Sequence, residues 1–271
     1  MKLRDKLKSL KEKYGSWALV TGASSGIGKE FAKYFADEGF NLVLVARRIE
    51  RLEELAKQLK EKNNIDVISV CADLSKDDFL SLVLEKIKDI EINILVNNAG
   101  IGSSGRFETI PTEKEIDLVK LNCLAPLILT HHFVKGMIKN KKGAIIFLGS
   151  IVAFQPNPFV STYAASKSFN LMMGSGLWYE LKKYNIDVLS VSPGGTRTEF
   201  LRTGKSNSGL IVDEPENVVR TAINALGKKP SIVHGIINKT MIKLSRLLPL
   251  KYSTRLAGFV ARTINKVIMF A

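Results

Sequence analysis

The chain has 271 residues, of which 45% are hydrophobic and 24% are charged, a composition typical of a globular protein with a well-buried core. No low-complexity tract and no repeat of solenoid length occurs, so global disorder and repeat architectures are excluded. The net charge of +14 lies mainly at the ends: residues 1–14 carry +4, residues 228–271 carry +9 without a single acid, and residues 15–227 carry only +1. An anionic partner is therefore expected at the ends, and no motif predicts nucleic-acid binding.

The N-terminus and the cysteines indicate the cellular location. Residues 1–14 alternate Lys with Leu and lack the apolar core of a signal peptide, and no uncharged apolar run of about 18 residues predicts a membrane span. Cys71 and Cys123 show neither a CxxC motif nor metal-ligand spacing, so we expect small buried residues in a reducing compartment. These features predict a cytoplasmic protein.

Short apolar runs bounded by turn residues alternate with stretches of helical periodicity. In the helix expected over 49–63, Leu52, Leu55, Ala56 and Leu59 recur at helical spacing while Glu and Lys face water. This alternation predicts an α/β fold with a doubly wound, Rossmann-like parallel sheet of about seven strands and helices on both faces. The six clearest strands are expected at 17–22, 41–46, 66–71, 93–98, 143–150 and 187–193.

We divide the chain into a basic amphipathic N-terminal helix (1–14), a Rossmann-like domain (15–237) and a basic, amphipathic, helical C-terminal extension (238–271). The extension mixes basic and apolar residues in two segments separated by Pro249. Two interpretations stay open. The extension contacts an anionic membrane surface peripherally, or its apolar faces pack on the domain or on a second subunit.

Ligands of a doubly wound sheet bind in the loops after the carboxyl ends of its strands. Gly22, Gly26 and Gly28 lie between the first strand and the first helix, where missing side chains let backbone N–H groups approach a pyrophosphate. Ordinary turn glycines are the alternative. The strand before them and the helix after them favour a dinucleotide.

The end of the second strand indicates which dinucleotide binds. Where NAD sites carry a carboxylate for the ribose hydroxyls, this sequence has Arg47 followed by Arg48. A guanidinium binds a 2′-phosphate through charge-assisted hydrogen bonds, so the substitution favours NADP. The alternative is a solvated pair of arginines that opens the next helix.

Tyr163 and Lys167 are four residues apart in a predicted helix, so both side chains project from one face. An ammonium beside a phenol stabilises the phenolate and brings its pKa toward the neutral range, which suits proton transfer. Ser150, at the end of a strand, could hydrogen-bond a substrate oxygen. Taken alone, a Tyr and a Lys at this spacing are more often an amphipathic surface pair.

In combination these motifs resemble the short-chain dehydrogenase/reductase family, of the type with a TGxxxGxG cofactor motif. The match covers roughly residues 15–200 and keeps the family's order. It comprises TGASSGIG at 21–28, CADLS at 71–75, NNAG at 97–100, Asn122, Ser150, YAASK at 163–167 and PG at 193–194.

The resemblance implies four catalytic residues. Tyr163 would exchange the proton with the substrate, and Lys167 would hold the nicotinamide ribose and lower the pKa of Tyr163. Ser150 would orient the carbonyl, and Asn122 would support a proton-relay water. A capped or kinked helix near Pro126 is the alternative reason for Asn122.

The resemblance also implies a cofactor site. Asp73 would meet the adenine, Asn97 would flank its ribose, and the loop from Pro193 would meet the carboxamide. The whole set expected around NADP is Gly22, Ser24, Ser25, Gly26, Ile27, Gly28, Arg47, Arg48, Asp73, Leu74, Asn97, Asn98, Ala99, Gly100, Tyr163, Lys167, Pro193, Gly194, Thr196 and Thr198.

Two positions depart from the family pattern. Many NADP-using relatives have a basic residue before the second motif glycine, and Ser25 occupies that position. Arg47 and Arg48 would therefore have to bind the 2′-phosphate. In the PGxVxT pattern, Thr196 replaces the apolar residue, whereas Thr198 matches the threonine.

Loop composition suggests the substrate. A lid over roughly 197–212 would contain Phe200, Leu201, Leu210 and Ile211, and the opposite wall would contain Val152, Phe154, Phe159 and Val160. No basic cluster falls there to pair a carboxylate, so we expect a small lipophilic carbonyl or alcohol that is steroid-, acyl- or lipid-like. The adjacent His131 and His132 would point about 100° apart on a helix, so no metal site is predicted.

The resulting hypothesis is an NADP(H)-dependent oxidoreductase that interconverts a ketone or aldehyde with an alcohol, as a homodimer or homotetramer by family analogy. A non-catalytic NADP-binding sensor or membrane-associated binding protein is the alternative, and it predicts decay of the Ser-Tyr-Lys set, which is intact here. An epimerase or dehydratase would carry TGxxGxxG and a longer substrate domain, and neither is present.

Overall fold

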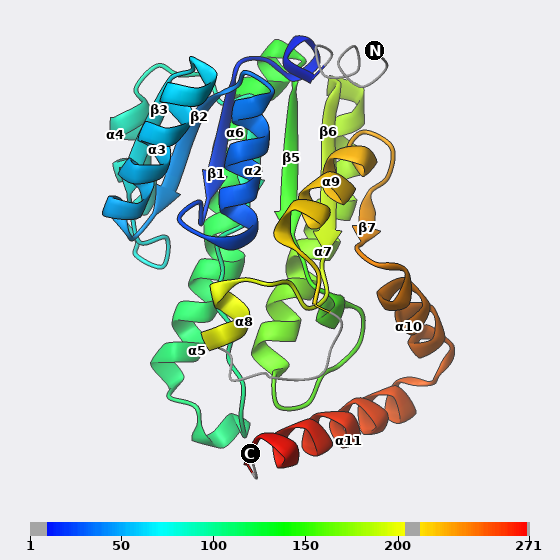
Figure 1. The fold of residues 1–271 in the computed structure, drawn as a ribbon. Helices are drawn as coiled ribbons and strands as arrows, with labels where there is room; N and C mark the ends of the chain where they lie inside the picture. The colour runs from blue at the N-terminus through cyan, green and yellow to red at the C-terminus, as the bar shows by residue number, and fades with distance from the viewer. Residues whose placement is uncertain (1–9, 204–211, 270–271) are drawn as a thin grey trace.

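The structure is a computed structural model that describes residues 10–203 and 212–269 (Figure 1). Within these residues, seven parallel strands form one sheet in the order β3-β2-β1-β4-β5-β6-β7. The strands are β1 (Trp17–Thr21), β2 (Asn41–Ala46), β3 (Val67–Cys71), β4 (Ile94–Asn97), β5 (Gly143–Leu148), β6 (Ile186–Ser192) and β7 (Ser231–Val233). The predicted doubly wound fold is confirmed. The sequence pattern missed only β7, which is too short to show a period.

Helices cover both faces of the sheet (Figure 1). They are α2 (Gly26–Asp37), α3 (Ile49–Asn63), α4 (Phe79–Ile87), α5 (Thr112–Val119), α6 (Ala125–Asn140), α7 (Ser161–Leu181), α8 (Glu199–Thr203), α9 (Pro215–Ala225), α10 (Ile236–Leu247) and α11 (Leu250–Met269). Short turns of other helix types are η1 (Phe107–Thr109), η2 (Lys120–Leu124), η3 (Ile151–Phe154) and η4 (Lys182–Tyr184). The predicted helix over 49–63 has the observed bounds of α3.

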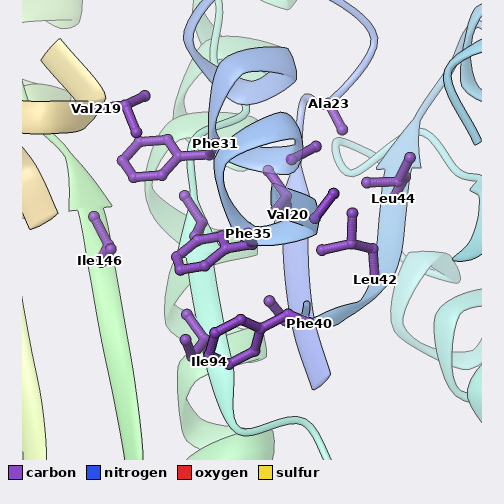
Figure 2. Packing of buried hydrophobic residues seen from close by; sticks show 14 of the residues in the cluster. Val20, Ala23, Phe31, Phe35, Phe40, Leu42, Leu44, Ile94, Ile146 and Val219 are labelled. Atoms are coloured by element: carbon purple, nitrogen blue, oxygen red, sulfur yellow. The ribbon is translucent and has the colours of Figure 1, made fainter. Parts of the chain in front are cut away.

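The core consists of two apolar clusters, one on each face of the sheet. Successive strand residues point to opposite faces, so Val20 joins the cluster under α2 and α9, whereas Leu19 joins the cluster under α4, α6 and α7. In the first cluster, the ring centroids of Phe31 and Phe35 are 6.1 Å apart and those of Phe35 and Phe40 are 5.4 Å apart (Figure 2). This packing fixes α2, and with it the glycine loop, against β1.

The sheet order places the functional loops. β1 has β2 on one side and β4 on the other, and the connection from β3 to β4 crosses the sheet. The loops after β1 and β4 therefore diverge to opposite faces, which is the switch point where doubly wound sheets bind ligands.

The N-terminal end of the described chain packs on the domain. Residues 10–14 are helical, and the buried Tyr14 hydroxyl donates to Asp187 Oδ2 at 2.7 Å. The rest of the N-terminal helix predicted over 1–14 lies outside the described residues. At the other end, two helices flank Pro249 as predicted, and the first of them, α10, begins at Ile236. Among the described residues, no helix is both long and apolar enough to cross a membrane.

The expectation for the cysteines is wrong for Cys71. Cys71 is exposed and Cys123 is half-buried. Cys71 ends β3, which is an edge strand with only one strand neighbour, so its side chain reaches the surface.

Candidate active site

A cleft of about 480 Å³ opens at the carboxyl ends of the strands. The predicted catalytic and cofactor residues line it, with the exception of Gly28, Asn97 and Asn122. Ile101, Leu121, Gly149, Ile151 and Gly195 also line the cleft and were missed, because their apolar or glycine side chains carry no chemical signal.

The glycine loop between β1 and α2 fits a pyrophosphate. Gly22 and Gly26 have φ angles of 66° and 56°, in the left-handed region that favours glycine. A Cβ at Gly28 would lie 2.4 Å from Asn98 Nδ2, so this glycine permits the loop to close although it does not line the cleft. No acidic residue and no side-chain cap occupies the first turn of α2, so its N–H groups stay available to an anion.

Asn98 holds the glycine loop from the neighbouring strand. Its Nδ2 donates to the carbonyl oxygens of Thr21 at 2.8 Å and Gly22 at 3.3 Å, and Thr21 Oγ1 accepts from the backbone N–H of Asn98 at 3.0 Å. Asn97, in contrast, is 6% exposed and its Nδ2 donates to Thr130 on α6 at 3.0 Å. The side chain of Asn97 therefore points away from the cleft, since adjacent residues alternate in direction at the end of β4.

Arg48 closes the glycine loop from the side of β2. Its guanidinium donates to Ser24 Oγ at 2.9 Å and Ser25 Oγ at 3.0 Å. Ser25 stands where many relatives carry a basic residue, so Arg48 brings a positive charge to the same place from another strand. Arg47 lies 4.0 Å from the carboxylate of Asp73 and is mostly exposed.

Glu199 was missed by the sequence interpretation. Its carboxylate accepts from Arg48 at 2.7 Å and from Arg51 at 2.6 Å, which ties α8 to α3. These two hydrogen bonds lower the pKa of Glu199 to about 2. Glu199 is the single acid of the loop 192–200 and could have been noted, but only the fold brings it to the two arginines.

Asp73, in the loop after β3, lines the cleft as a fixed hydrogen-bond acceptor. Its Oδ1 accepts from the N–H of Ser75 at 3.0 Å and from the Ser75 hydroxyl at 2.8 Å. Burial acts to raise the pKa of Asp73, but the hydrogen bonds from Ser75 and the charge of Arg47 outweigh it and hold the pKa below its usual value.

Tyr163, Lys167 and Ser150 meet at the inner end of the cleft. Lys167 Nζ lies 5.8 Å from the centroid of the Tyr163 ring and donates to the carbonyl oxygen of Leu148 at 3.0 Å. Burial raises the pKa of Tyr163 to about 12, and a hydrogen bond with Ser150 acts in the opposite direction. Burial lowers the pKa of Lys167 to about 8. The expectation that Lys167 lowers the pKa of Tyr163 is therefore not met, because burial of the phenol dominates. At neutral pH the phenol holds its proton and the lysine remains mostly cationic.

Asn122 stands in the π-helical turn η2 between α5 and α6. Its Oδ1 accepts from the N–H of Ile101 at 3.0 Å, and its Nδ2 donates to the Ile101 carbonyl at 2.9 Å and to Ser166 Oγ at 3.0 Å. The amide therefore links the loop after β4 to α7 from within this π-helical turn, which lies directly before α6 and Pro126. This side chain positions the catalytic helix rather than lining the cleft.

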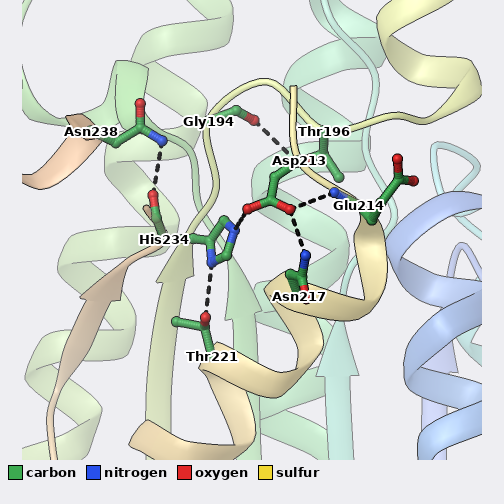
Figure 3. Close-up of polar contacts among 8 residues, drawn as sticks. All are labelled: Gly194, Thr196, Asp213, Glu214, Asn217, Thr221, His234 and Asn238. Atoms are coloured by element: carbon green, nitrogen blue, oxygen red, sulfur yellow. Dashed lines mark hydrogen bonds and ion pairs between the residues drawn. The ribbon is translucent and has the colours of Figure 1, made fainter. Parts of the chain in front are cut away.

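A polar network fixes the loop after β6 (Figure 3). Thr196 forms a β-bridge with Asp213, whose carboxylate accepts from Asn217 Nδ2 at 2.7 Å and pairs with His234 Nε2 at 2.8 Å. His234 Nδ1 lies 2.8 Å from Thr221 Oγ1 on α9. These residues come from the loop after β6, from α9 and from the segments just before α9 and just after β7. No sequence spacing predicts their meeting.

The expected substrate walls are correct in part. Phe200, Leu201 and Val152 line the cleft, and the ring centroids of Phe200 and Tyr163 are 5.8 Å apart. Phe154 and Phe159 do not line it, because they turn toward Arg246 and Arg262 of the C-terminal helices. Val160 is likewise absent from the cleft lining. Leu210 and Ile211 lie outside the described residues. No cluster of three or more metal-ligating side chains occurs in the described part of the chain.

Comparisons with known proteins agree with this geometry. A family model described as short chain dehydrogenase matches residues 16–208. The chain is 36% identical over 219 residues to the very-long-chain 3-oxoacyl-CoA reductase of Coccidioides immitis. This alignment covers 79% of this chain and 62% of that protein. It is 31% identical over 238 residues to the 7β-hydroxysteroid dehydrogenase of Clostridium sardiniense, with 87% and 91% covered.

Solved structures show the same likeness. A structure of 7β-hydroxysteroid dehydrogenase superposes with a TM-score of 0.86 at 28% identity and covers 92% of this chain and 98% of that chain. A short-chain dehydrogenase from Sphingobium yanoikuyae in complex with NADPH has a TM-score of 0.76 at 33% identity, with 86% and 94% covered. The chain belongs to the short-chain dehydrogenase family, and the predicted family and enzyme class, an oxidoreductase, are confirmed.

Proposed function

We propose that the protein is an NADPH-dependent reductase of lipophilic ketones or aldehydes, which also catalyses the reverse alcohol oxidation. The observation that carries the proposal is the meeting of Ser150, Tyr163 and Lys167 in a cleft whose other half is the glycine loop and Arg48. The prediction of NADP as the cofactor is confirmed by the likeness to NADPH-bound relatives.

The residues act as follows in reduction. NADPH, when bound, supplies the hydride to the carbonyl carbon. Tyr163 gives its phenolic proton to the carbonyl oxygen, and Ser150 donates a hydrogen bond to the same oxygen. The ammonium of Lys167 stabilises the phenolate that remains, because Lys167 is only 5% exposed and its charge is weakly screened. Because the pKa of Tyr163 is raised, the phenol is protonated at neutral pH and begins reduction with the proton that it gives.

The cleft walls favour an apolar substrate. Ile101, Leu121, Val152, Phe200 and Leu201 line the same cleft as Tyr163. Among the described residues that line the cleft, the basic ones are Lys167, Arg47 and Arg48, and Arg48 lies at the glycine loop. The relatives named above act on a 3-oxoacyl-CoA and a 7β-hydroxysteroid, which are both lipophilic carbonyl or alcohol compounds. A steroid-, acyl- or lipid-like substrate is the class we assign.

We also propose a cytoplasmic homodimer or homotetramer with peripheral membrane contact through 238–271. Exposed apolar side chains on η2, α6 and α7 support self-association: Leu124 is 43%, Leu127 40% and Met172 64% exposed. Light scattering of the purified chain tests the oligomeric state, and the substitution Met172→Glu is expected to weaken a dimer formed through these helices.

The function is tested with purified full-length protein. NADPH is expected to bind more tightly than NADH in a fluorescence titration. A panel of lipophilic ketones should then oxidise the bound NADPH, which is followed as the loss of its nicotinamide absorbance. Tyr163→Phe should lower kcat by about 10²–10⁴-fold, whereas Tyr179→Phe, an exposed tyrosine on the same helix, should not. Binding without turnover on any substrate would favour the sensor alternative.

A further inference from the structure

The C-terminal helices turn apolar side chains away from the domain. In α10, Ile242 is 9% exposed, while Leu244, roughly 200° further around the helix, is 60% exposed. Ile236 and Leu247, at opposite ends of the same outward face, are each 80% exposed. This arrangement is the reverse of an ordinary surface helix, in which the apolar stripe faces the core.

The second helix repeats the pattern. Ala257 is half-buried, and a Cβ at Gly258 would lie 3.3 Å from Pro158 Cγ, so this face of α11 packs on the loop before α7. Phe259, roughly 200° around the helix from Ala257, is 69% exposed, and Leu256 is 54% exposed. We call the outward side chains the α10–α11 surface; its members are Ile236, Ile237, Met241, Leu244, Leu247, Tyr252, Leu256, Phe259 and Val260.

The charges around this surface have one sign. The exposed Lys239 and Lys243 lie beside the apolar stripe of α10, and Lys251, Arg255 and Arg262 lie beside that of α11. Residues 228–271 contain nine Lys/Arg and no acid. An apolar stripe flanked by basic residues is typical of a helix that lies in the plane of a membrane interface.

The surface adjoins the substrate side of the cleft. The Arg246 guanidinium lies 5.0 Å from the ring centroid of Phe154, and the Arg262 guanidinium lies 5.9 Å from that of Phe159. Both phenylalanines belong to the segment that connects Ser150 to Tyr163. In Figure 1, α11 crosses the end of the molecule toward which the strands point, and this end carries the cleft.

We propose that the α10–α11 surface binds an anionic lipid bilayer and thereby holds the cleft close to the membrane, from which a lipophilic substrate can enter. Neither helix crosses the bilayer; both lie in its interface. A second copy of the chain fits this surface less well, because two acid-free surfaces of like charge would meet. The lipid contact deepens the membrane contact of the proposed function by naming the side chains and the lipid charge, and the route of the substrate rests on the proposed reductase activity.

The test is cosedimentation of the full chain with vesicles of phosphatidylcholine alone or mixed with phosphatidylglycerol. We expect binding to the mixed vesicles that weakens at high salt. The double variant Leu244→Glu with Phe259→Glu should bind about a hundredfold more weakly, since each residue loses an apolar burial. Lys251→Gln with Arg255→Gln should weaken binding about tenfold on anionic vesicles only. The matched control, Leu82→Glu with Phe107→Glu, adds the same charge on other exposed sites and should bind like the wild type.

The proposal is overturned if the chain does not bind the vesicles that contain phosphatidylglycerol. Self-association that Leu244→Glu with Phe259→Glu abolishes also overturns it, because that result assigns the surface to a second copy. NADPH titration of the same samples reports separately on the proposed function and shows that each variant is folded.

Discussion

The carboxylate of Glu199 is expected to weaken NADPH binding, and Glu199→Gln should therefore strengthen it. Glu199 pairs with Arg48, the guanidinium that also reaches Ser24 and Ser25 on the glycine loop. A 2′-phosphate would have to share or replace this partner and would face a carboxylate of its own sign. NADH lacks the phosphate, so its affinity should not change.

The solvent exposure of Arg48 and Glu199 sets the size of the expected change in NADPH affinity. The Arg48 and Glu199 side chains are 42% and 44% exposed, so the interaction is strongly screened by water. Two unit charges about 6 Å apart in water interact by about 0.7 kcal/mol, and a phosphate dianion doubles this to about 1.4 kcal/mol. The dissociation constant of NADPH should thus fall by about 3–10-fold at low salt and less at high salt.

The assay compares 2′,5′-ADP with 5′-AMP by calorimetry, since these two ligands differ in the 2′-phosphate alone. Glu214→Gln is the matched control, because Glu214 pairs with Arg197 at 2.6 Å and does not contact Arg48. An unchanged or weaker affinity for 2′,5′-ADP in Glu199→Gln would refute the reasoning, as would an equal gain for 5′-AMP.

Three further predictions concern the catalytic helix and the core. The kcat/KM for reduction should fall above about pH 8, because Lys167 loses its proton there. The substitution Lys167→Arg should move that fall to higher pH. A kcat/KM that stays constant up to about pH 10 would contradict the role of the ammonium. The pKa of Lys167 is about 8 in the folded chain against 10.5 ordinarily, so the unfolded chain binds this proton more tightly and stability is lost as pH falls from 10.5 to 8. Lys167→Met should therefore be more stable at pH 7 by ~2–3 kcal/mol, with a gain that shrinks toward pH 10 in urea unfolding; an equal gain at both pH values would contradict this origin. Phe35→Ala should lose about 3–5 kcal/mol in the same measurement, and the exposed Phe107→Ala should lose little.

The sequence predicted the fold and most of the cleft because both depend on local patterns. Periodicity located β1 to β6 and α3, and the short motifs lie at the carboxyl ends of those strands. Once the strands are parallel, their loops meet at one edge without any further information. The NADP prediction from Arg47 and Arg48 had the same basis.

What the sequence did not predict depends on contacts between distant segments. Glu199 meets Arg48 from 151 residues away, and His234 meets Asp213 across α9 and β7. Asn97 and Asn98 look equivalent in the motif, but the strand turns one to α6 and the other to the glycine loop. The direction of Phe154 and Phe159 likewise follows from the C-terminal helices, whose packing no local spacing encodes.

The hydrogen bonds from Asn98 to the glycine loop have a consequence for folding. They join residues 77 positions apart in the chain, and such long-range contacts form late because the intervening loop must first be ordered. The nucleotide pocket is complete only when β4 has docked beside β1, so recovery of NADPH fluorescence during refolding should lag behind the recovery of helical circular dichroism. NADPH binding would then report the moment at which the sheet is complete. Excess NADPH would stabilise the completed sheet by mass action, because it binds only the folded pocket.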